Sequence, residues 1–341
     1  MKLYPNVAFY FSIWLISLLL ISFIGFFTMP HSNVFSGNFF QSLSNWDGGH
    51  FLGIAEHGYS EKFQYAFFPL YPLLTGFLGR ITKDYLLAGD LISVTASFFG
   101  MQFLYKLVEL DFDKEKAKKV ILLLVCFPTS FFFLTVYSEG LFFFLVVATF
   151  YFLRTKKLLW ATILASLASA TRLAGLALVI ALFIEVFKSG VNRRNAFVLL
   201  APLGFLIYCW YLYTRIGDPF YFLVAQNHWQ RSLVLPGMNF LDSIKNLKFR
   251  DLLFAIFGVG LALRSFRFLP LSYSIYALVS LLLPLSTPSL ESMPRYLLPI
   301  FPLFILVAII KNKHTISAYQ MISLVLLCLF IVLFVNGYWV A

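Results

Sequence analysis

The sequence has very little charge for its length. Only 12% of its 341 residues are Asp, Glu, Lys or Arg, whereas soluble domains carry about 25%. A large core does not explain this deficit, because the surface of a water-soluble protein would still need charged side chains. A surface that faces lipid does not need them. The deficit therefore excludes an ordinary soluble domain and indicates an integral membrane protein.

Cysteine is also scarce. The sequence has three cysteines, Cys126, Cys209 and Cys328, and each lies inside an apolar run. Isolated thiols of this kind do not indicate a disulfide framework. The zinc-ligand spacings, the phosphate-binding P-loop and the glycine pattern of nucleotide-binding folds are absent from the sequence as well. Nothing in it therefore points to a nucleotide site.

Apolar sequence is abundant instead. The chain is 60% hydrophobic, and its apolar runs approach or exceed the roughly 20 residues that a helix needs to cross a bilayer. The first run begins near Val7 and lacks a small-residue cleavage site, so we expect a retained helix and not a removed signal peptide. We predict an all-α polytopic membrane protein in which residues 1–341 form a single integral membrane domain. The predicted crossings, about 11 in number, are 7–27, 86–108, the two halves of 120–153, the two halves of 158–187, 196–213, 251–263, 268–285, 296–310 and 316–339.

The basic residues predict the orientation of these helices. The net charge of +11 does not indicate a nucleic-acid partner, because Lys and Arg gather in short clusters between apolar runs, where they orient membrane helices. With the N-terminus inside, these clusters fall in short inner loops. The two long segments, 28–85 and 214–250, are then extracytoplasmic loops. The apolar stretch 67–79 could be a crossing, but it would move every later cluster outside, so we predict a helix that dips into the outer interface or lies along it.

The first outer loop holds the main candidate for chemistry. Asp47 precedes a predicted short helix, His50 to Glu56, which Gly58 would end. One interpretation is that Asp47 caps this helix. The other is that its carboxylate, at the outer membrane surface, accepts a proton from an acceptor hydroxyl; the two are compatible. Trp46 offers a face on which a sugar could stack, although membrane-interface belts use Trp without any such role.

Metal binding is the weaker interpretation of the histidines. His50 and His57 lie seven residues apart on one face of the predicted helix. They could form a metal pair, but polar residues at a wet interface explain them better. We therefore predict no metal ligand. A divalent cofactor is compatible with the expected chemistry but is not indicated.

Two arginines suggest an anion site. Arg172 lies in an otherwise apolar hairpin, and Arg295 begins a later crossing at the same outer face. An arginine at membrane depth needs an anion, a water-filled cavity or a nearby interface. Either residue could snorkel to the surface, but two on one face favour a phosphate, whose oxygens match the guanidinium fork. Glu139, at the outer tip of the first hairpin, is either a solvated turn residue or a substrate ligand.

The second outer loop adds a group of polar and aromatic residues. Gln226, His228, Trp229 and Arg231 offer hydrogen bonds and a stacking face together, so we predict that they bind substrate. An enzyme that faces outward cannot easily use cytosolic nucleotide sugars. With no nucleotide site in the sequence, its activated donor should be carried by lipid.

Several motifs of the chain resemble one membrane family. They are Trp46-Asp47-x-x-His50-Phe51, Ala66-Phe67-Phe68-Pro69-Leu70-Tyr71-Pro72, Tyr137-Ser138-Glu139, Ala170-Thr171-Arg172, Gly217-Asp218-Pro219 with Gln226 and Trp229, and Arg295-Tyr296 with Phe301-Pro302. Together they resemble the PIG-V family, the second mannosyltransferase of GPI-anchor synthesis and its prokaryotic relatives, within the GT-C membrane glycosyltransferases. The resemblance implies a polyprenyl- or dolichyl-phosphate sugar donor, usually of mannose, and an inverting transfer outside the membrane. It also implies an acidic residue near the chemistry, which maps onto Asp47. The chain is shorter than the eukaryotic members, so the GPI acceptor is not carried over.

We therefore expect an inverting glycosyltransferase that moves a sugar from a lipid-linked phosphate donor to an unidentified lipid, glycan or protein acceptor. Asp47 would be the base and Arg172 and Arg295 would hold the donor phosphate. The expected substrate ligands are Trp46, His50, Glu139, Gln226, His228, Trp229 and Arg231. The expected location is the plasma membrane of a prokaryote or the endoplasmic reticulum of a eukaryote, with an extracytoplasmic active site.

Two other classes of membrane protein remain as alternatives. A transporter or lipid flippase would also have polar residues at membrane depth, but it should show a polar path to both sides. Here the ionisable residues gather at one face. A structural scaffold would explain the hydrophobicity but would leave the outer Asp and Arg residues without a role.

Overall fold

The computed structural model describes residues 3–33, 37–190, 195–245 and 248–340, and every regular element in these ranges is a helix. This confirms the predicted all-α class. Four units in the described ranges are long and apolar enough to cross a membrane. They are α1 (Pro5–Thr28), α5 (Tyr85–Asp111), the continuous pair of η3 (Ala196–Leu200) and α10 (Leu203–Ile216), and α17 (Lys313–Val335).

The two predicted hairpins contain shorter helices. The first consists of α6 (Lys114–Val125) and α7 (Glu139–Arg154), which both pack mainly on α5, and the second consists of α8 (Leu158–Ser169) and α9 (Gly175–Ser189). These helices have 12 to 16 residues and are therefore about 18–24 Å long, whereas the hydrocarbon core of a bilayer is about 30 Å thick. The count of about 11 crossings consequently stays a prediction.

The carboxyl-terminal part of the chain is interrupted by proline. The predicted crossing 296–310 is divided between α15 (Met293–Leu297) and α16 (Phe301–Ala308), with Pro299 and Pro302 at the break. Proline lacks the N–H that a continuous helix needs, so the break is expected where two prolines lie close together. The helices before this break are α13 (Phe249–Phe268) and α14 (Leu271–Leu285).

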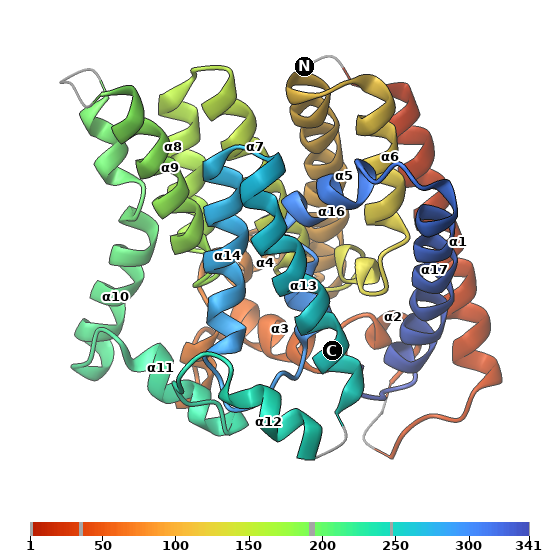
Figure 1. The fold of residues 1–341 in the computed structure, drawn as a ribbon. Helices are drawn as coiled ribbons and strands as arrows, with labels where there is room; N and C mark the ends of the chain where they lie inside the picture. Colours follow the sequence, from red (N-terminus) through yellow and green to blue (C-terminus); the bar gives the residue numbers. More distant parts are fainter. Residues whose placement is uncertain (1–2, 34–36, 191–194, 246–247, 341) are drawn as a thin grey trace.

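Short helices from both long loops gather at one end of the molecule. In Figure 1 the labels of α2, α3, α11 and α12 lie at the lower end, while the N-terminus and the α5–α6 and α7–α8 connections lie at the upper end. This is the separation of long loops from basic connections that the predicted orientation requires. The bounds are α2 (Phe39–Ser42), α3 (Asp47–His57), η1 (Lys62–Ala66), α11 (Tyr221–Ala225), η4 (Gln226–Trp229) and α12 (Met238–Lys245).

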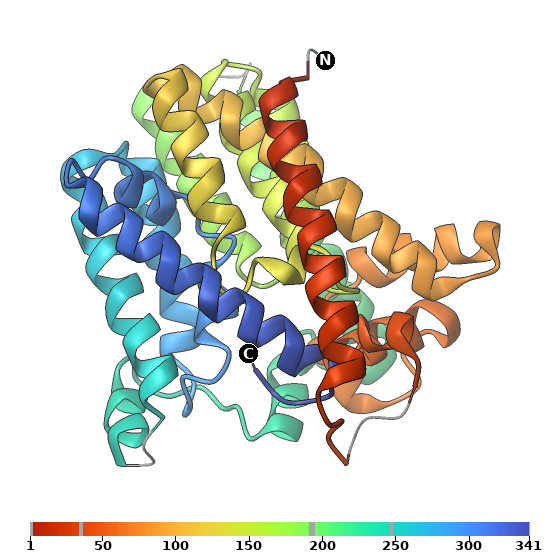
Figure 2. The same ribbon diagram turned by 90° about the vertical axis from the view of Figure 1, so that its right-hand side faces the viewer.

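The ambiguous apolar stretch 67–79 largely coincides with α4 (Leu70–Thr82), a helix of 13 residues. At about 20 Å it is too short to cross the hydrocarbon core alone. Leu73, Phe77 and Ile81 on one face are exposed, whereas Tyr71 and Thr75 on the other are buried. In Figure 2 α4 and the first part of α5 extend sideways from the body. The helix thus presents an apolar face outward, where lipid could cover it, and packs its other face on the body.

Neighbouring residues hydrogen-bond the tip of the first hairpin. This tip runs from Cys126 to Ser138, lies between α6 and α7, and contains the 3-10 helix η2 (Ser130–Phe133). Ser97 of α5 donates to the carbonyl of Phe133 at 3.1 Å, and Ser93 donates to that of Tyr137 at 3.2 Å. Irregular backbone at membrane depth is tolerated only when protein satisfies its polar groups, and these serines satisfy two of the carbonyls in the tip.

The orientation can be tested with single cysteines in a variant that lacks the three native ones. Ser60 and Ser232 lie in the two long loops, and Lys156 lies in the α7–α8 connection; all three are exposed. A cysteine at Ser60 or Ser232 should react with a membrane-impermeant maleimide on intact cells, because both loops are predicted to lie outside. A cysteine at Lys156 should react only after permeabilisation. Labelling of position 156 on intact cells with position 60 protected would reverse the orientation.

Candidate active site

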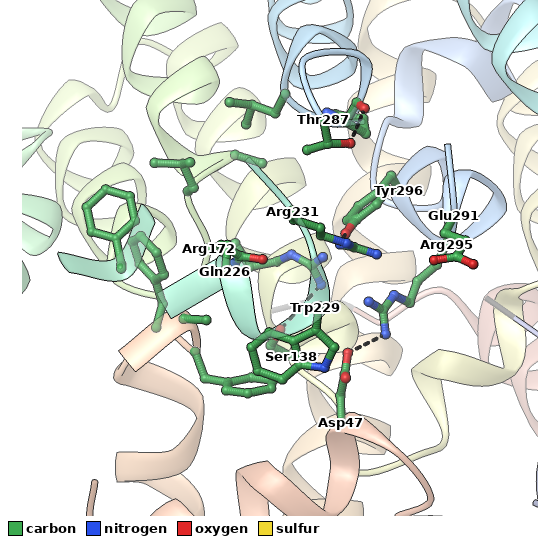
Figure 3. Close-up of a pocket in the computed structure, with 18 of the residues that line it drawn as sticks. Asp47, Ser138, Arg172, Gln226, Trp229, Arg231, Thr287, Glu291, Arg295 and Tyr296 are labelled. Carbon is green, nitrogen blue, oxygen red and sulfur yellow. Dashed lines mark hydrogen bonds and ion pairs between the residues drawn. The ribbon is translucent and has the colours of Figure 1, made fainter. Parts of the chain in front are cut away.

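A cavity of about 690 Å³ lies where the tips of both hairpins meet the short helices of the long loops. Figure 3 shows its lining, which comes from segments far apart in the sequence. Part of the wall is apolar, with Phe142 of α7, Leu173 before α9, and Tyr276 and Leu283 of α14. The predicted site residues that line it are Asp47, Glu139, Arg172, Gln226, His228, Trp229, Arg231 and Arg295.

Asp47 is the first residue of α3 and does not occupy its cap position. The N-cap is Trp46, with a φ of 60°, so the predicted capping role of Asp47 is wrong. The Asp47 carboxylate is turned instead toward Arg295, whose Nη1 donates to its Oδ2 at 2.7 Å. The predicted end of the helix at Gly58 is confirmed, because this residue follows His57 with a φ of 76°.

The chain before Asp47 is held in a strained conformation. A positive φ is unfavourable for a bulky residue such as Trp46 and costs about 1–3 kcal/mol, so it persists only where the surroundings enforce it. The side chain of Asn45 donates to the carbonyl of Phe334 in α17, and the backbone carbonyl of Asn45 accepts from the hydroxyl of Tyr137, both at 2.8 Å. The hairpin tip and α17 therefore fix the start of α3, and with it the position of Asp47.

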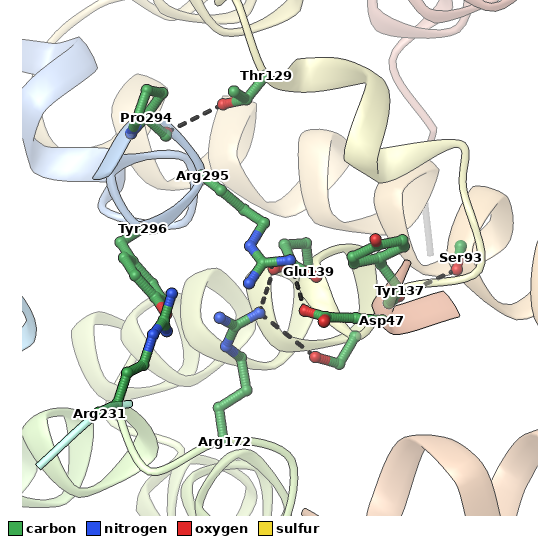
Figure 4. Close-up of polar contacts among 11 residues, drawn as sticks. Asp47, Ser93, Thr129, Tyr137, Glu139, Arg172, Arg231, Pro294, Arg295 and Tyr296 are labelled. Atoms are coloured by element: carbon green, nitrogen blue, oxygen red, sulfur yellow. Dashed lines mark hydrogen bonds and ion pairs between the residues drawn. The ribbon is translucent and has the colours of Figure 1, made fainter. Parts of the chain in front are cut away.

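An ion chain of four residues crosses the cavity wall (Figure 4). Arg295 bonds Asp47 and also lies 3.5 Å from Glu139, measured from its Nε to Oε1. Arg172 pairs with the same Oε1 atom and donates to the hydroxyl of Ser138 at 3.3 Å. The order is Asp47, Arg295, Glu139, Arg172.

Glu139 is the most deeply buried member of this chain. Its side chain is 1% exposed, compared with 6% for Arg295 and 19% for Asp47. The interpretation of Glu139 as a solvated turn residue is therefore wrong. The reason is packing: Gly140 allows α7 to approach α5 so closely that an added Cβ would overlap Ser97, and this draws Glu139 inward.

Three arginines surround one tyrosine ring. The guanidinium carbons of Arg172, Arg231 and Arg295 lie 5.9, 5.8 and 5.7 Å from the ring centre of Tyr296, and Arg231 also donates to its hydroxyl. Arg172 and Arg295 have carboxylate partners in the ion chain. In the described ranges no carboxylate lies within ion-pair distance of Arg231. We call these three arginines the arginine ring. They carry three positive charges, against two negative charges on their carboxylate partners Asp47 and Glu139.

Aromatic residues from the two long loops meet beside the cavity. His50 contacts Phe63, Phe67 and Trp229 at centroid distances of 5.2, 5.4 and 6.0 Å, and His228 stacks on Phe63 at 4.3 Å. Burial lowers the pKa of His50 below its usual value, which favours the neutral ring at pH 7. His50 supports Trp229 from behind and does not itself line the cavity.

Trp46 also lies outside the cavity lining, contrary to what a stacking role would require. Its ring packs edge-on against Trp339 at 5.1 Å, and it is Trp339 that lines the cavity. Sequence reasoning missed Trp339, since a tryptophan near the end of a crossing looks like an interface residue. It also missed Glu291, which lines the cavity and lies 3.4 Å from Lys248.

No group of three His, Cys, Asp or Glu residues in the described part of the chain could hold a metal ion. The nearest candidate pair, Asp47 and Glu139, is bridged by the guanidinium group of Arg295. These residues can bind an anion, exchange hydrogen bonds and accept a proton.

With this geometry established, comparison with known proteins is informative. Residues 27–192 match the family described as mannosyltransferase (PIG-V). This confirms the PIG-V resemblance. GPI mannosyltransferase 2 of Drosophila pseudoobscura pseudoobscura is 32% identical over 116 residues, which make up 30% of this chain and 26% of the fly protein. The same-named protein of Schizosaccharomyces pombe is 31% identical over 119 residues, 33% of this chain and 25% of the yeast protein. The matched segments thus span about a quarter of these relatives.

Solved structures extend the similarity in fold to most of the chain. ArnT from Cupriavidus metallidurans bound to undecaprenyl phosphate has a TM-score of 0.55 at 15% identity, covering 91% of this chain and 62% of ArnT. The Archaeoglobus fulgidus oligosaccharyltransferase AglB, in complex with an inhibitory peptide and a dolichol-phosphate, has a TM-score of 0.53 at 13% identity, covering 97% of this chain and 56% of AglB. Both are GT-C membrane proteins, so the predicted GT-C fold and polytopic membrane class are confirmed.

Proposed function

We propose that this protein is an inverting membrane glycosyltransferase that uses a polyprenyl- or dolichyl-phosphate sugar, with mannose as the expected sugar. The acceptor is a hydroxyl group of a lipid, glycan or protein. The observation that carries the proposal is the placement of Asp47 beside the arginine ring in one cavity. The PIG-V match over residues 27–192 and the undecaprenyl phosphate bound by ArnT support the same chemistry.

The proposed reaction is a single displacement at the anomeric carbon. The acceptor oxygen forms a bond to this carbon while the bond from the carbon to the phosphate oxygen breaks. The proton of the acceptor hydroxyl moves to the carboxylate of Asp47, and the polyprenyl phosphate leaves with the bonding electron pair. One displacement inverts the anomeric centre, so no covalent intermediate with the protein is needed. A base in this position typically contributes about 10²–10⁴ to the rate.

The arginine ring is the proposed phosphate site. Arg172 and Arg295 were the expected ligands, yet each already has a carboxylate partner. Arg231 therefore becomes a principal phosphate ligand, with the remaining N–H groups of the other two completing the site. An arginine has five N–H donors, so a guanidinium group can bond a carboxylate and a phosphate together. Positive charge that is already present in the cavity stabilises the negative charge that develops on the leaving phosphate.

The apolar wall of the same cavity suits the prenyl chain. Phe142, Leu173, Tyr276 and Leu283 form this wall beside Arg172. The phosphate and its lipid would thus be recognised by adjacent surfaces of different chemistry. Trp229 and Trp339 offer aromatic faces for sugar rings.

The proposed location is an extracytoplasmic active site in the plasma membrane of a prokaryote or in the endoplasmic reticulum of a eukaryote. The cavity is lined by both long loops, and these lie at the end opposite to the basic α5–α6 and α7–α8 connections (Figure 1). A flippase or transporter is the competing proposal. It predicts movement of the lipid across liposomes without sugar transfer, so a combined assay for lipid movement and for product mass distinguishes the two.

Replacing Asp47 with Asn tests the proposed base. The amide keeps the size of the side chain but cannot accept the proton, so sugar transfer should fall by about 10²–10⁴ while the donor still binds. Turnover is measured with purified protein, polyprenyl-phosphate mannose and candidate acceptors, with product masses as the readout. Asp218→Asn is the matched control, because Asp218 does not line the cavity and its side chain accepts a backbone N–H in a turn of the second long loop. Near-parent turnover by well-folded Asp47→Asn protein would remove Asp47 from the mechanism.

Replacing each ring arginine with Ala tests the phosphate site. A hydrogen bond to a charged group contributes about 1.5–3 kcal/mol, so Arg231→Ala should weaken polyprenyl phosphate binding by roughly 10- to 100-fold. Arg172→Lys should also weaken it, because the charge remains but the planar fork is lost. Calorimetry in detergent gives the affinities, and Arg215→Ala, on α10 over Tyr211, is the control. If Arg172→Ala, Arg231→Ala and Arg295→Ala all bind polyprenyl phosphate as tightly as the parent, these arginines do not form the phosphate site.

A further inference from the structure

Arg295 lies between two carboxylates but is hydrogen-bonded to only one of them (Figure 4). Its Nη1 donates to Asp47 at 2.7 Å, whereas its Nε lies 3.5 Å from Oε1 of Glu139. Within the described ranges neither Nε of Arg295 nor Oε2 of Glu139 has a hydrogen-bond partner. Buried charged groups rarely leave such bonds unmade. An unused donor thus lies close to a carboxylate with an unused acceptor.

The surroundings of Arg295 permit a short movement toward Glu139. Its guanidinium group lies over the rings of Phe132, Tyr137 and Tyr296, at 5.5, 5.5 and 5.7 Å. Aromatic faces attract a cation without fixing it through directional hydrogen bonds. A shift of roughly half an ångström would bring Nε within about 3 Å of Glu139, the usual hydrogen-bond distance, and a larger displacement takes Nη1 out of hydrogen-bond range of Asp47.

The contact between Arg295 and Asp47 presents a problem for the proposed reaction. A guanidinium group beside a carboxylate stabilises the charged form, so Asp47 is a weaker base for an acceptor hydroxyl while Arg295 is bonded to it. The same guanidinium group is a proposed ligand of the donor phosphate, so Asp47 and the phosphate both attract it. Asp47 becomes a stronger base if Arg295 moves away from it, and Glu139 is the carboxylate that can receive Arg295.

We propose that Arg295 moves from Asp47 to Glu139 when the donor phosphate enters, and that Glu139 is the positioning residue that makes this movement possible. The proposal rests on the function proposed above. Donor binding frees the base, so activation of the acceptor waits until the leaving group is in place. The phosphate favours the moved state because it bonds Arg295 there and competes with Asp47 for the same N–H groups.

The signs of two affinity changes test this movement without requiring sugar transfer. Asp47→Asn and Glu139→Gln each remove one negative charge near the phosphate site. If charge alone matters, both variants should bind polyprenyl phosphate more tightly. The movement predicts opposite signs: Asp47→Asn removes the competitor and strengthens binding by about tenfold, whereas Glu139→Gln removes the receiving carboxylate and weakens binding by about tenfold. Calorimetry with polyprenyl phosphate, and with polyprenol as the uncharged probe, gives both values.

Two further variants separate positioning from folding. Glu139→Asp keeps the charge and should recover part of the affinity and of kcat. Asp111→Asn is the control, because Asp111 is a buried carboxylate that pairs with Arg154 at 2.8 Å and accepts from Tyr273, at residues that do not line the cavity. It should lower the unfolding temperature without changing phosphate affinity. If Glu139→Gln does not fold, Glu139→Asp replaces it, because the shorter side chain keeps the charge but lies further from Arg295: the movement predicts weaker phosphate binding, and an effect of charge alone predicts no change.

The outcomes separate the movement from the proposed function. Opposite signs together with sugar transfer support both. Opposite signs without transfer from any lipid-phosphate sugar support the movement and overturn the proposed reaction. Tighter binding in both variants, with transfer intact in the parent, overturns the movement and leaves the reaction standing. Absence of polyprenyl phosphate binding by the parent overturns both.

Discussion

The burial of one guanidinium group is the constraint on which the arrangement of the cavity depends. Arg295 is 6% exposed, and a charge so far from water is stable only with opposite charge close by. Asp47 of α3 and Glu139 of α7 supply that charge. The first residue of α3 and the first residue of α7 must therefore meet at α15. This requirement brings three distant parts of the chain to one point and closes one side of the cavity.

The same requirement explains why the first hairpin stops inside the body. If α6 and α7 continued as full crossings, Glu139 would be carried to the surface and Arg295 would lose a partner. The alternative is a non-helical tip at depth, and its backbone groups then need partners. Ser93 and Ser97 donate to two carbonyls of the tip, and Thr129 of the tip donates to the carbonyl of Pro294 beside Arg295. The sequence thus combines an apolar hairpin with small hydroxyl residues at its contacts.

Hydrophobic periodicity and residue type determine how much of the site could be predicted from the sequence. Low charge and long apolar runs predict a helical membrane protein, and the cost of an arginine at depth identifies Arg172 and Arg295 as unusual. Neither the apolar pattern nor the cost of a buried arginine identifies which residue a side chain will contact. The inward turn of Glu139 depends on Gly140 packing against α5, and the place of Asp47 after the cap depends on contacts of Asn45 with α17 and the hairpin tip. The crossing count was uncertain for a related reason, because helices of 12 to 16 residues lie between the lengths of spanning and interfacial segments.

The balance of charge gives the ion chain a role beyond holding α3, α7 and α15 together. In the proposed reaction the donor enters as a phosphodiester with one negative charge, and Asp47 carries another. When the glycosidic bond forms, the proton neutralises Asp47 and the departing phosphate gains the charge that Asp47 loses. The total negative charge in the cavity is unchanged, but its centre moves from Asp47 toward the arginine ring. Arg295 belongs both to the ion chain and to the arginine ring, so after it has moved from Asp47 toward Glu139 it lies beside the phosphate, whose negative charge grows. A buried cation placed in this way reduces the reorganisation that such a charge shift would require in water.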